Sequence, residues 1–294
     1  MSIGIFASVK PVIHMTWMTG MPGATTVDDG GAKRHNVGAM QRAAAAIFAP
    51  IVAGARATPL YRQVKSALLR AIESGQCQAG AALPSEAALA AALGVSIGTL
   101  RHATDDLVAE HILVRRQGRG TFVAVHNADR FMFQFFHVER SDGLRQAPRV
   151  ELLAFERVRI EEEPALALGL KPGEPAIRID NRLLLQGKAV IHDQLTLPAT
   201  LFKGLTEKRL RERKSTIYHL YQTEFGITVT RAREHARAAI ADRSLSRLLG
   251  VASGAPVLVV RRTALTFGDK PVEYRISTID TARHEYVHLL SRPA

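Results

Sequence analysis

Residues 83–123 constrain the fold of this chain more than any other stretch. They contain two short helical patterns on either side of a glycine-containing turn, followed at once by a basic hairpin pattern. In the first helical pattern Ser85 is a natural N-cap, and Leu89 and Leu93 lie one turn apart on the same face. Gly94 ends this helix, because glycine enters the left-handed backbone region at low cost. The stretch therefore begins as a helix followed by a tight turn.

A second helix is predicted to begin after Ser96, with Leu100, Ala103 and Leu107 on its apolar face. Two helices joined by a short glycine turn form the helix-turn-helix of DNA-binding proteins. The second helix of this motif enters the major groove with its N-terminal residues at the base edges. We expect the groove-facing residues to be Ser96, Ile97, Gly98, Thr99, Arg101 and His102.

The pattern changes to a period of two after Glu110, which predicts strands at residues 112–116 and 121–125 with a turn between them. No acidic residue lies in this hairpin, and Arg119 is flanked by glycines at its tip. Such an arginine suits the narrow minor groove. An ordinary solvated hairpin is the alternative. The predicted DNA contacts are Arg115, Arg116, Gln117, Gly118, Arg119, Gly120 and Thr121.

Residues 59–125 contain a dense series of motifs, among them PLY, LPSE, LGVS and RRQGRGTFV. They resemble the GntR family of bacterial transcription regulators, which have a winged helix-turn-helix. The resemblance implies operator contacts at three places: after the LPSE turn, at the start of the second helix and in the hairpin. This adds Ser85 and Glu86 to the predicted contacts. Ala87 and Ile97 stand where the family often has arginine, so two common contacts lack their arginine here.

The length of 294 residues is enough for two domains, and the net charge of +12 favours an anionic partner. Residues 59–125 carry seven basic and five acidic side chains, so DNA binding depends on where those charges lie. The single cysteine, Cys77, excludes an intramolecular disulfide and fits the reducing cytoplasm. No apolar run reaches the length of a membrane span. The eleven histidines form no recognisable ligand spacing, so no metal and no cofactor are predicted.

Four segments are expected along the chain. Residues 1–57 are a disordered or mis-annotated N-terminal extension, with Met40 among several possible later starts. Residues 58–126 form the winged helix-turn-helix domain and begin with a helix at residues 60–74. Residues 127–130 are a linker, and residues 131–291 form a second domain. His14, His35 and His126 are expected to face solvent.

The second domain contains a weak internal repeat, because LGLKPGEP at residues 168–175 is echoed by LGVASGAP at residues 249–256. Each copy follows a strand and a short helix, and each leads into a hairpin. A helix with Ile217, Leu220 and Tyr221 on one face separates the halves. The repeat predicts a mostly antiparallel sheet with helices, so the chain is of the α+β class. The aromatic residues 130–136 are expected to form a core strand, with a nucleic-acid stacking platform as the alternative.

The FERVR strand, the LGL-x-PG-x-P turn, the LPATLF stretch and the PVEYRISTID strand resemble the UTRA effector-binding domain of the HutC subfamily. This resemblance spans nearly the whole second domain and implies a fold like that of chorismate lyase. It also implies that a small metabolite binds between sheet and helices and alters DNA binding.

Candidate effector ligands are polar residues on segments that otherwise read as buried. Arginine suits a carboxylate or phosphate, so an anionic effector is considered. Asn181 and Leu183 stand where an Arg-x-Arg spacing is expected from the resemblance. The alternative for each candidate is a cross-strand ion pair facing solvent. The candidates are Arg178, Asn181, Arg182, His192, Asp193, Thr216, Tyr218, Glu273 and Arg275.

The sequence thus predicts a cytoplasmic homodimer that places two helix-turn-helix heads on a palindromic operator about one helical turn apart. Its expected role is that of a repressor released by a metabolite, without enzymatic activity. Two alternatives stay open: lyase-like catalysis by the second domain, and non-specific binding to DNA.

Overall fold

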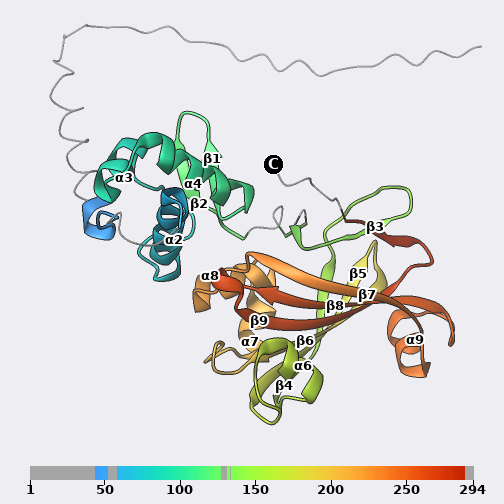
Figure 1. The fold of residues 1–294 in the computed structure, drawn as a ribbon. Coiled ribbons are helices and arrows are strands. Elements are labelled where there is room, and N and C mark those ends of the chain that lie inside the picture. Colours follow the sequence, from blue (N-terminus) through green and yellow to red (C-terminus); the bar gives the residue numbers. More distant parts are fainter. Residues whose placement is uncertain (1–43, 52–57, 127–130, 133, 289–294) are drawn as a thin grey trace, which may run out of the picture.

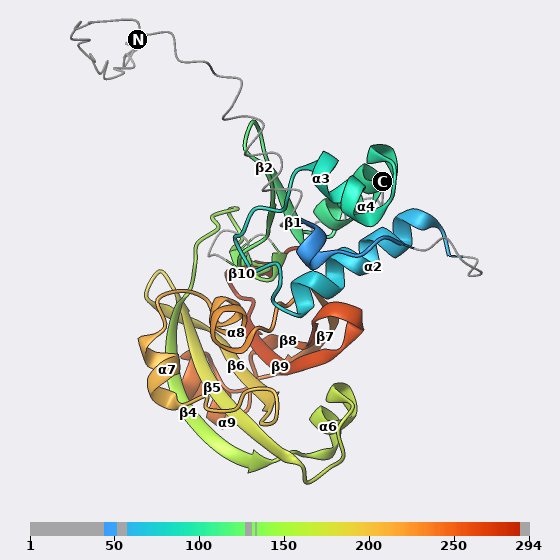
Figure 2. The same ribbon diagram turned by 90° about the vertical axis from the view of Figure 1, so that its left-hand side faces the viewer.

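The computed structural model describes residues 44–51, 58–126, 131–132 and 134–288. Figure 1 shows two lobes, a small helical one and a larger one built on a sheet. We call residues 58–126 the head and residues 131–288 the sheet domain. Figure 2 shows the head above the part of the sheet domain that holds β7, β8 and β9.

The head contains three helices and a hairpin in the predicted order. These are α2 (Leu60–Glu73), α3 (Glu86–Leu93), α4 (Ile97–Ala109), β1 (Leu113–Arg116) and β2 (Gly120–Val123). Ser85 caps α3 by accepting from the N–H of Ala88, and Gly94 ends it with a φ of 67°. The two strands pair antiparallel, with Arg116 opposite Gly120. The predicted winged helix-turn-helix is therefore confirmed, with slightly shorter strands.

The core of the head lies where α2 crosses α4, and each leucine fully buried there contributes roughly 1.5–3 kcal/mol. Its buried members include Val64, Leu68, Leu89, Leu93, Leu100, Leu107 and Val123, together with Cys77.

Part of the predicted N-terminal extension is ordered against this core. Residues 44–47 form one helical turn, and Phe48 is buried in the head's cluster. The N–H of Ile51 donates to the carbonyl of Leu93 at 2.9 Å. Residues 44–51 are therefore not an unstructured extension. Residues 1–43 and 52–57 lie outside the described residues.

The sheet domain is built on six antiparallel strands in the order β4-β5-β6-β9-β8-β7. They are β4 (Arg149–Arg159), β5 (Pro175–Leu185), β6 (Lys188–Pro198), β7 (Arg231–Ile240), β8 (Pro256–Leu265) and β9 (Pro271–Asp280). Each half runs strand, helix, hairpin. The helices α6 (Glu162–Leu168) and α9 (Arg243–Leu249) both end at a left-handed glycine. The predicted repeat is confirmed, and its halves join where β6 pairs with β9.

One face of the sheet is covered by α7 (Glu207–Glu212), α8 (Ile217–Phe225) and a two-stranded ribbon. The ribbon pairs β3 (Val138–Arg140) with β10 (His284–Tyr286). Ile179 and Leu195 of the sheet pack against Tyr218 and Tyr221 of α8. Helix α6 contacts β9 on the opposite face, where Tyr274 joins its cluster. The polar residues between α8 and the sheet are thereby enclosed.

The prediction of a core strand at residues 130–136 is wrong. Residues 131, 132 and 134 are helical, and the N–H groups of Phe135 and Phe136 both donate to the carbonyl of Phe131. Phe135 and Phe136 are nevertheless buried in the core. A short apolar run is compatible with a buried helix or a buried strand, and here the chain closes into a helical turn.

Candidate nucleic-acid interface and effector cavity

The start of α4 is fixed by its own cap and faces outward. The Oγ of Ser96 accepts from the N–H of Thr99 at 3.1 Å and lies 2.9 Å from its hydroxyl. Ile97 is 43% exposed although it is apolar. Thr99 is half-buried, and the other predicted groove-facing residues are all exposed: Ser96, Ile97, Gly98, Arg101 and His102. This surface is therefore open to a partner.

Surface acids hold two of the predicted DNA-contacting arginines. Arg101 donates to Glu86 at 2.7 Å, and Arg115 lies 2.5 Å from Asp105. Pairs at such exposed positions contribute about 0–1 kcal/mol, so phosphate groups can replace the acids at little cost. The ring of His102 stacks on Tyr61 with 4.0 Å between centroids, which fixes the orientation of His102.

The tip of the hairpin depends on two glycines with positive φ, Gly118 at 69° and Gly120 at 104°. They flank Arg119, which is exposed. The guanidinium of Arg116 lies 4.7 Å from the centroid of the Phe122 ring, so Arg116 is steadied along the strand. The remaining predicted contacts, Ser85, Glu86, Gln117 and Thr121, are exposed or half-buried. The predicted DNA contacts thus lie on accessible parts of α3, α4 and the hairpin.

A cavity of about 250 Å³ lies between the start of α8 and strands β5, β6 and β9. A second, smaller cavity of about 30 Å³ shares four of its lining residues, Phe131, Leu183, Asp193 and Arg275. The walls of the larger cavity combine apolar side chains with a set of polar ones. The polar members are Asn181, Asp193, Arg213, Lys214, Ser215, Thr216 and Arg275.

The inner wall of this cavity is a fully paired network centred on Arg275. Its guanidinium donates to both carboxylate oxygens of Glu273, at 2.9 and 3.1 Å, and to Asp193 at 3.1 Å. Glu273 also accepts from the hydroxyls of Tyr218 at 3.1 Å and Tyr221 at 2.7 Å. Burial raises the pKa of both tyrosines, so both remain neutral donors. The network compensates its buried charges and fixes the inner wall.

The outer wall keeps polar groups that lack such partners. Among the described residues no carboxylate pairs with Arg213 or Lys214, and Arg213 donates to the carbonyl of Leu210. Burial lowers the pKa of Arg213. The Oδ1 of Asn181 is buried without a hydrogen-bond partner. Thr216 caps α8, whose N-terminus carries partial positive charge. This wall suits an anionic group.

Six of the nine predicted effector residues lie in this network or cavity: Asn181, Asp193, Thr216, Tyr218, Glu273 and Arg275. The other three point to the opposite face of the sheet, because side chains alternate along a strand. Arg178 pairs there with Glu161 at 2.9 Å, Arg182 with Glu151 at 2.8 Å, and His192 lies 3.8 Å from Asp180.

Sequence reasoning missed Arg213, Lys214 and Tyr221. The signal for the first two was a basic pair just ahead of Thr216, the N-cap of α8. A basic pair at that place adds positive charge to a helix N-terminus.

Helix α8 also holds the chain that leaves the head. The amide of Gln222 accepts from the N–H of His126 at 2.9 Å and donates to the carbonyl of Ala124 at 3.2 Å. The Nδ1 of His219 donates to the carbonyl of His126 at 2.8 Å. The expectation that His126 faces solvent is wrong, since its side chain is fully buried beside Phe135. His14 and His35 lie outside the described residues.

A second contact between the lobes comes from the turn that joins β8 and β9. Phe267, in the short 3-10 helix at Phe267–Asp269, is buried in the same apolar cluster as α2 and α4. The neighbouring hydroxyl of Thr266 donates to the carbonyl of Thr228 at 2.8 Å. The head therefore packs on the sheet domain through α8 and through this turn.

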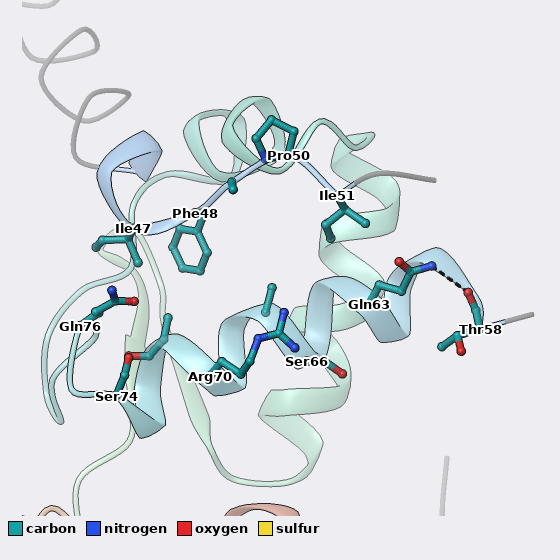
Figure 3. A pocket seen from close by; sticks show the side chains of 13 residues that line it. Ile47, Phe48, Pro50, Ile51, Thr58, Gln63, Ser66, Arg70, Ser74 and Gln76 are labelled. Carbon is teal, nitrogen blue, oxygen red and sulfur yellow. Dashed lines mark hydrogen bonds between the residues drawn. The ribbon is translucent and has the colours of Figure 1, made fainter. Parts of the chain in front are cut away.

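A larger cavity of about 680 Å³ lies in the first lobe, between the segment that holds Phe48 and helix α2 (Figure 3). Gln63 at its edge donates to the carbonyl of Thr58 at 3.0 Å. Arg70 is its one charged lining residue among those described. We favour the 250 Å³ cavity of the sheet domain as the effector site, because it joins apolar walls to several convergent polar groups.

Two protein families match the chain. Residues 60–123 match the bacterial regulatory proteins of the gntR family, and residues 143–285 match the UTRA domain. These are the two families that the sequence motifs of the head and of the sheet domain resemble. No helix among the described residues is long and apolar enough to cross a membrane.

Several known proteins are similar to this chain. The HTH-type transcriptional repressor NagR of Bacillus subtilis is 28% identical over 80% of the chain and 96% of its own length. The mannosyl-D-glycerate transport/metabolism system repressor MngR of Escherichia coli is 25% identical over 80% of the chain and 97% of its own length. The crystal structure of the ligand-binding domain of a GntR-family transcriptional regulator from Bordetella bronchiseptica is 33% identical. The match covers 54% of this chain and 99% of the Bordetella domain, with a TM-score of 0.51.

Proposed function

The chain belongs to the GntR family of bacterial regulatory proteins and carries a UTRA domain, and on this basis we propose that it is a homodimeric repressor of a palindromic operator. It is a ligand-responsive DNA-binding regulator and not an enzyme, and two of its relatives are named as repressors. We further propose that the effector is a small anionic metabolite, that binding releases the operator, and that the protein acts in the cytoplasm beside its DNA.

The observation that carries this proposal is the position of α8. Thr216, its N-cap, lines the effector cavity, Tyr218 bonds to Glu273 of the inner wall, and Gln222 holds the chain that leaves the head. A helix of nine residues is about 14 Å long, so a shift at one end reaches the other. Ligand binding can therefore change the free energy of docking the head, which couples the two sites.

The anionic character of the effector is argued from the outer wall. Arg213, Lys214 and the N-terminus of α8 offer positive charge there, whereas Asp193 is already held by Arg275 and Ser277. A carboxylate or phosphate group would gain charge-assisted hydrogen bonds from this wall. One relative is named as the repressor of a mannosyl-D-glycerate transport/metabolism system, and mannosyl-D-glycerate contains a carboxylate.

Operator binding is tested by footprinting the full chain on the DNA upstream of its own gene. We expect two protected half-sites with centres about one helical turn apart, and a dimer by light scattering. Uniform coating of the DNA would support a non-specific DNA-binding protein instead and would contradict the proposal.

The effector is tested by a thermal-shift screen of small carboxylates and sugar phosphates, because a ligand of the folded state raises the melting temperature. An active compound should shift the wild type and the Arg178→Gln variant alike, and should lose most of its effect on Arg213→Gln. Arg178 is the matched control, since its guanidinium pairs with Glu161 on the other face of the sheet. Equal shifts in all three proteins would remove Arg213 from the effector site.

A further inference from the structure

Three potential metal ligands meet in the sheet domain outside the two sites described above. They are a ring nitrogen of His137, a carboxylate oxygen of Glu234 and a ring nitrogen of His288, all within 4.8 Å of one another. His137 directly precedes β3, Glu234 lies in β7, and His288 follows β10. More than fifty residues separate any two of them in the sequence, which is why no ligand spacing was visible there.

We propose that His137, Glu234 and His288 bind one divalent transition-metal ion such as Zn²⁺. Two imidazoles and one carboxylate are a common ligand set for such ions and leave a position for water. An ion centred among three atoms 4.8 Å apart would lie roughly 2.8 Å from each, and Zn²⁺ needs about 2.0–2.2 Å. Each side chain then has to move by less than about 1 Å.

The surroundings hold the ligands in place. Arg262 donates to one oxygen of Glu234 at 2.5 Å, and the hydroxyl of Tyr286 donates to the other. Each carboxylate oxygen can accept a second interaction, so Glu234 can bind a metal ion while both bonds persist. Hydrogen-bonded carboxylates of this kind are usual around metal sites. The ring of His137 lies against Tyr286, with centroids 5.4 Å apart, and against His288 at 4.7 Å.

The charged groups near the site have opposing effects on the binding of a cation. Glu234 is negative, whereas Arg262 is buried beside it and is held in turn by the carbonyl of Phe135 at 2.6 Å. The guanidinium therefore weakens attraction for a cation without displacing the carboxylate. A bound ion would join the ribbon of β3 and β10 to β7 at the edge of the large sheet.

The test uses the metal-free full chain and Zn²⁺ alone, titrated by calorimetry, with Co²⁺ absorption spectra as a second readout. We expect one tight Zn²⁺ per wild-type chain and visible Co²⁺ bands from nitrogen and oxygen ligands. His288→Ala should lower the affinity at least roughly tenfold, as loss of even a supporting partner does at metal sites. His288 is exposed, so this variant is expected to fold.

His235→Ala is the matched control, because His235 is exposed on the same strand as Glu234 and next to it. It should bind Zn²⁺ like the wild type, and Glu234→Gln should lose affinity like His288→Ala. Equal affinity in the wild type and in His288→Ala would overturn the proposal. So would tight Zn²⁺ binding that Glu234→Gln leaves unchanged, since the ion would then lie elsewhere.

Discussion

Arg101 lies on the exposed surface of α4 and pairs with Glu86 across the turn of the helix-turn-helix. Replacing it with alanine should cost roughly 1–3 kcal/mol of operator binding if its guanidinium reads a base. Fluorescence anisotropy with operator DNA measures this, with Arg243→Ala on the exposed side of α9 as the control. An Arg101→Ala protein that binds as tightly as the control would assign base reading to other residues.

His284 gives a prediction for the dependence of stability on pH. Its side chain is 7% exposed and both ring nitrogens are buried without hydrogen-bond partners. Burial lowers the pKa of His284 below 6.5, against the opposing effect of Asp280. Below about pH 6.5 the unfolded chain therefore binds more protons at this position than the folded chain. The stability from a neutral His284 is present above pH 6.5 and is lost as the pH falls.

His284→Leu should remove this part of the pH dependence without lowering the free energy of unfolding at pH 7.5, because the ring nitrogens that it removes have no hydrogen-bond partners. Urea denaturation at pH 7.5 and 5.5 measures both quantities. His235→Leu, at an exposed position of β7, should keep the wild-type slope. If the slopes of the two variants match, another group causes the pH dependence.

The orientation of the effector candidates shows how far sequence can go at this scale. Asn181 and Arg182 are neighbours, yet one faces the cavity and the other pairs with Glu151 outside. This difference could be predicted from the sequence, because side chains alternate along a strand and Asn181 lies on the same face as the buried Ile177 and Ile179. The position of Arg213 was not available in this way, since it depends on the path between α7 and α8.

Elements were predicted well where a local pattern specified them. The helices and hairpin of the head occur within a few residues of the predicted bounds, and the duplicated strand, helix and hairpin units occur in the predicted order. The failures lie where distant elements decide the outcome. His126 is buried by α8, more than 90 residues away, and nothing near it in the sequence signals that contact.

The contact of α8 with the head gives a prediction at the scale of elements. Gln222→Met keeps the approximate shape of the side chain but removes its hydrogen bonds to the N–H of His126 and to the carbonyl of Ala124. An unmatched buried polar group costs about 1–3 kcal/mol. Urea denaturation should show a loss of that size. Gln194→Met, at an exposed position of β6, should change stability by less than about 0.5 kcal/mol.

The same variant separates docking from folding. If α8 transmits the effector signal, Gln222→Met should also reduce the change in operator affinity caused by an active effector. If Gln222→Met lowers stability but the effector still changes operator affinity as much as in the wild type, the signal does not pass through the contact of Gln222 with the head.

At the scale of the whole molecule, the turn that holds Phe267 unites the two lobes. Phe267→Ala removes a large side chain from the cluster of α2 and α4, and such truncations cost about 3–5 kcal/mol in a core. We expect calorimetry to show one transition for the wild type and two for the variant, with the head melting first. Phe225→Ala, a half-buried position packed within the sheet domain, should destabilise without separating the transitions. A single transition in Phe267→Ala would show that α8 alone suffices to couple the lobes.

The origin of Phe267 also bears on how the protein is made. The last strand of the head ends at Val123, and the phenylalanine that completes its apolar cluster comes from the turn after β8. During synthesis the ribosome releases the head long before it releases that turn. A nascent head thus lacks part of its interior until nearly the whole polypeptide has emerged, and a prematurely terminated product would leave the cluster open.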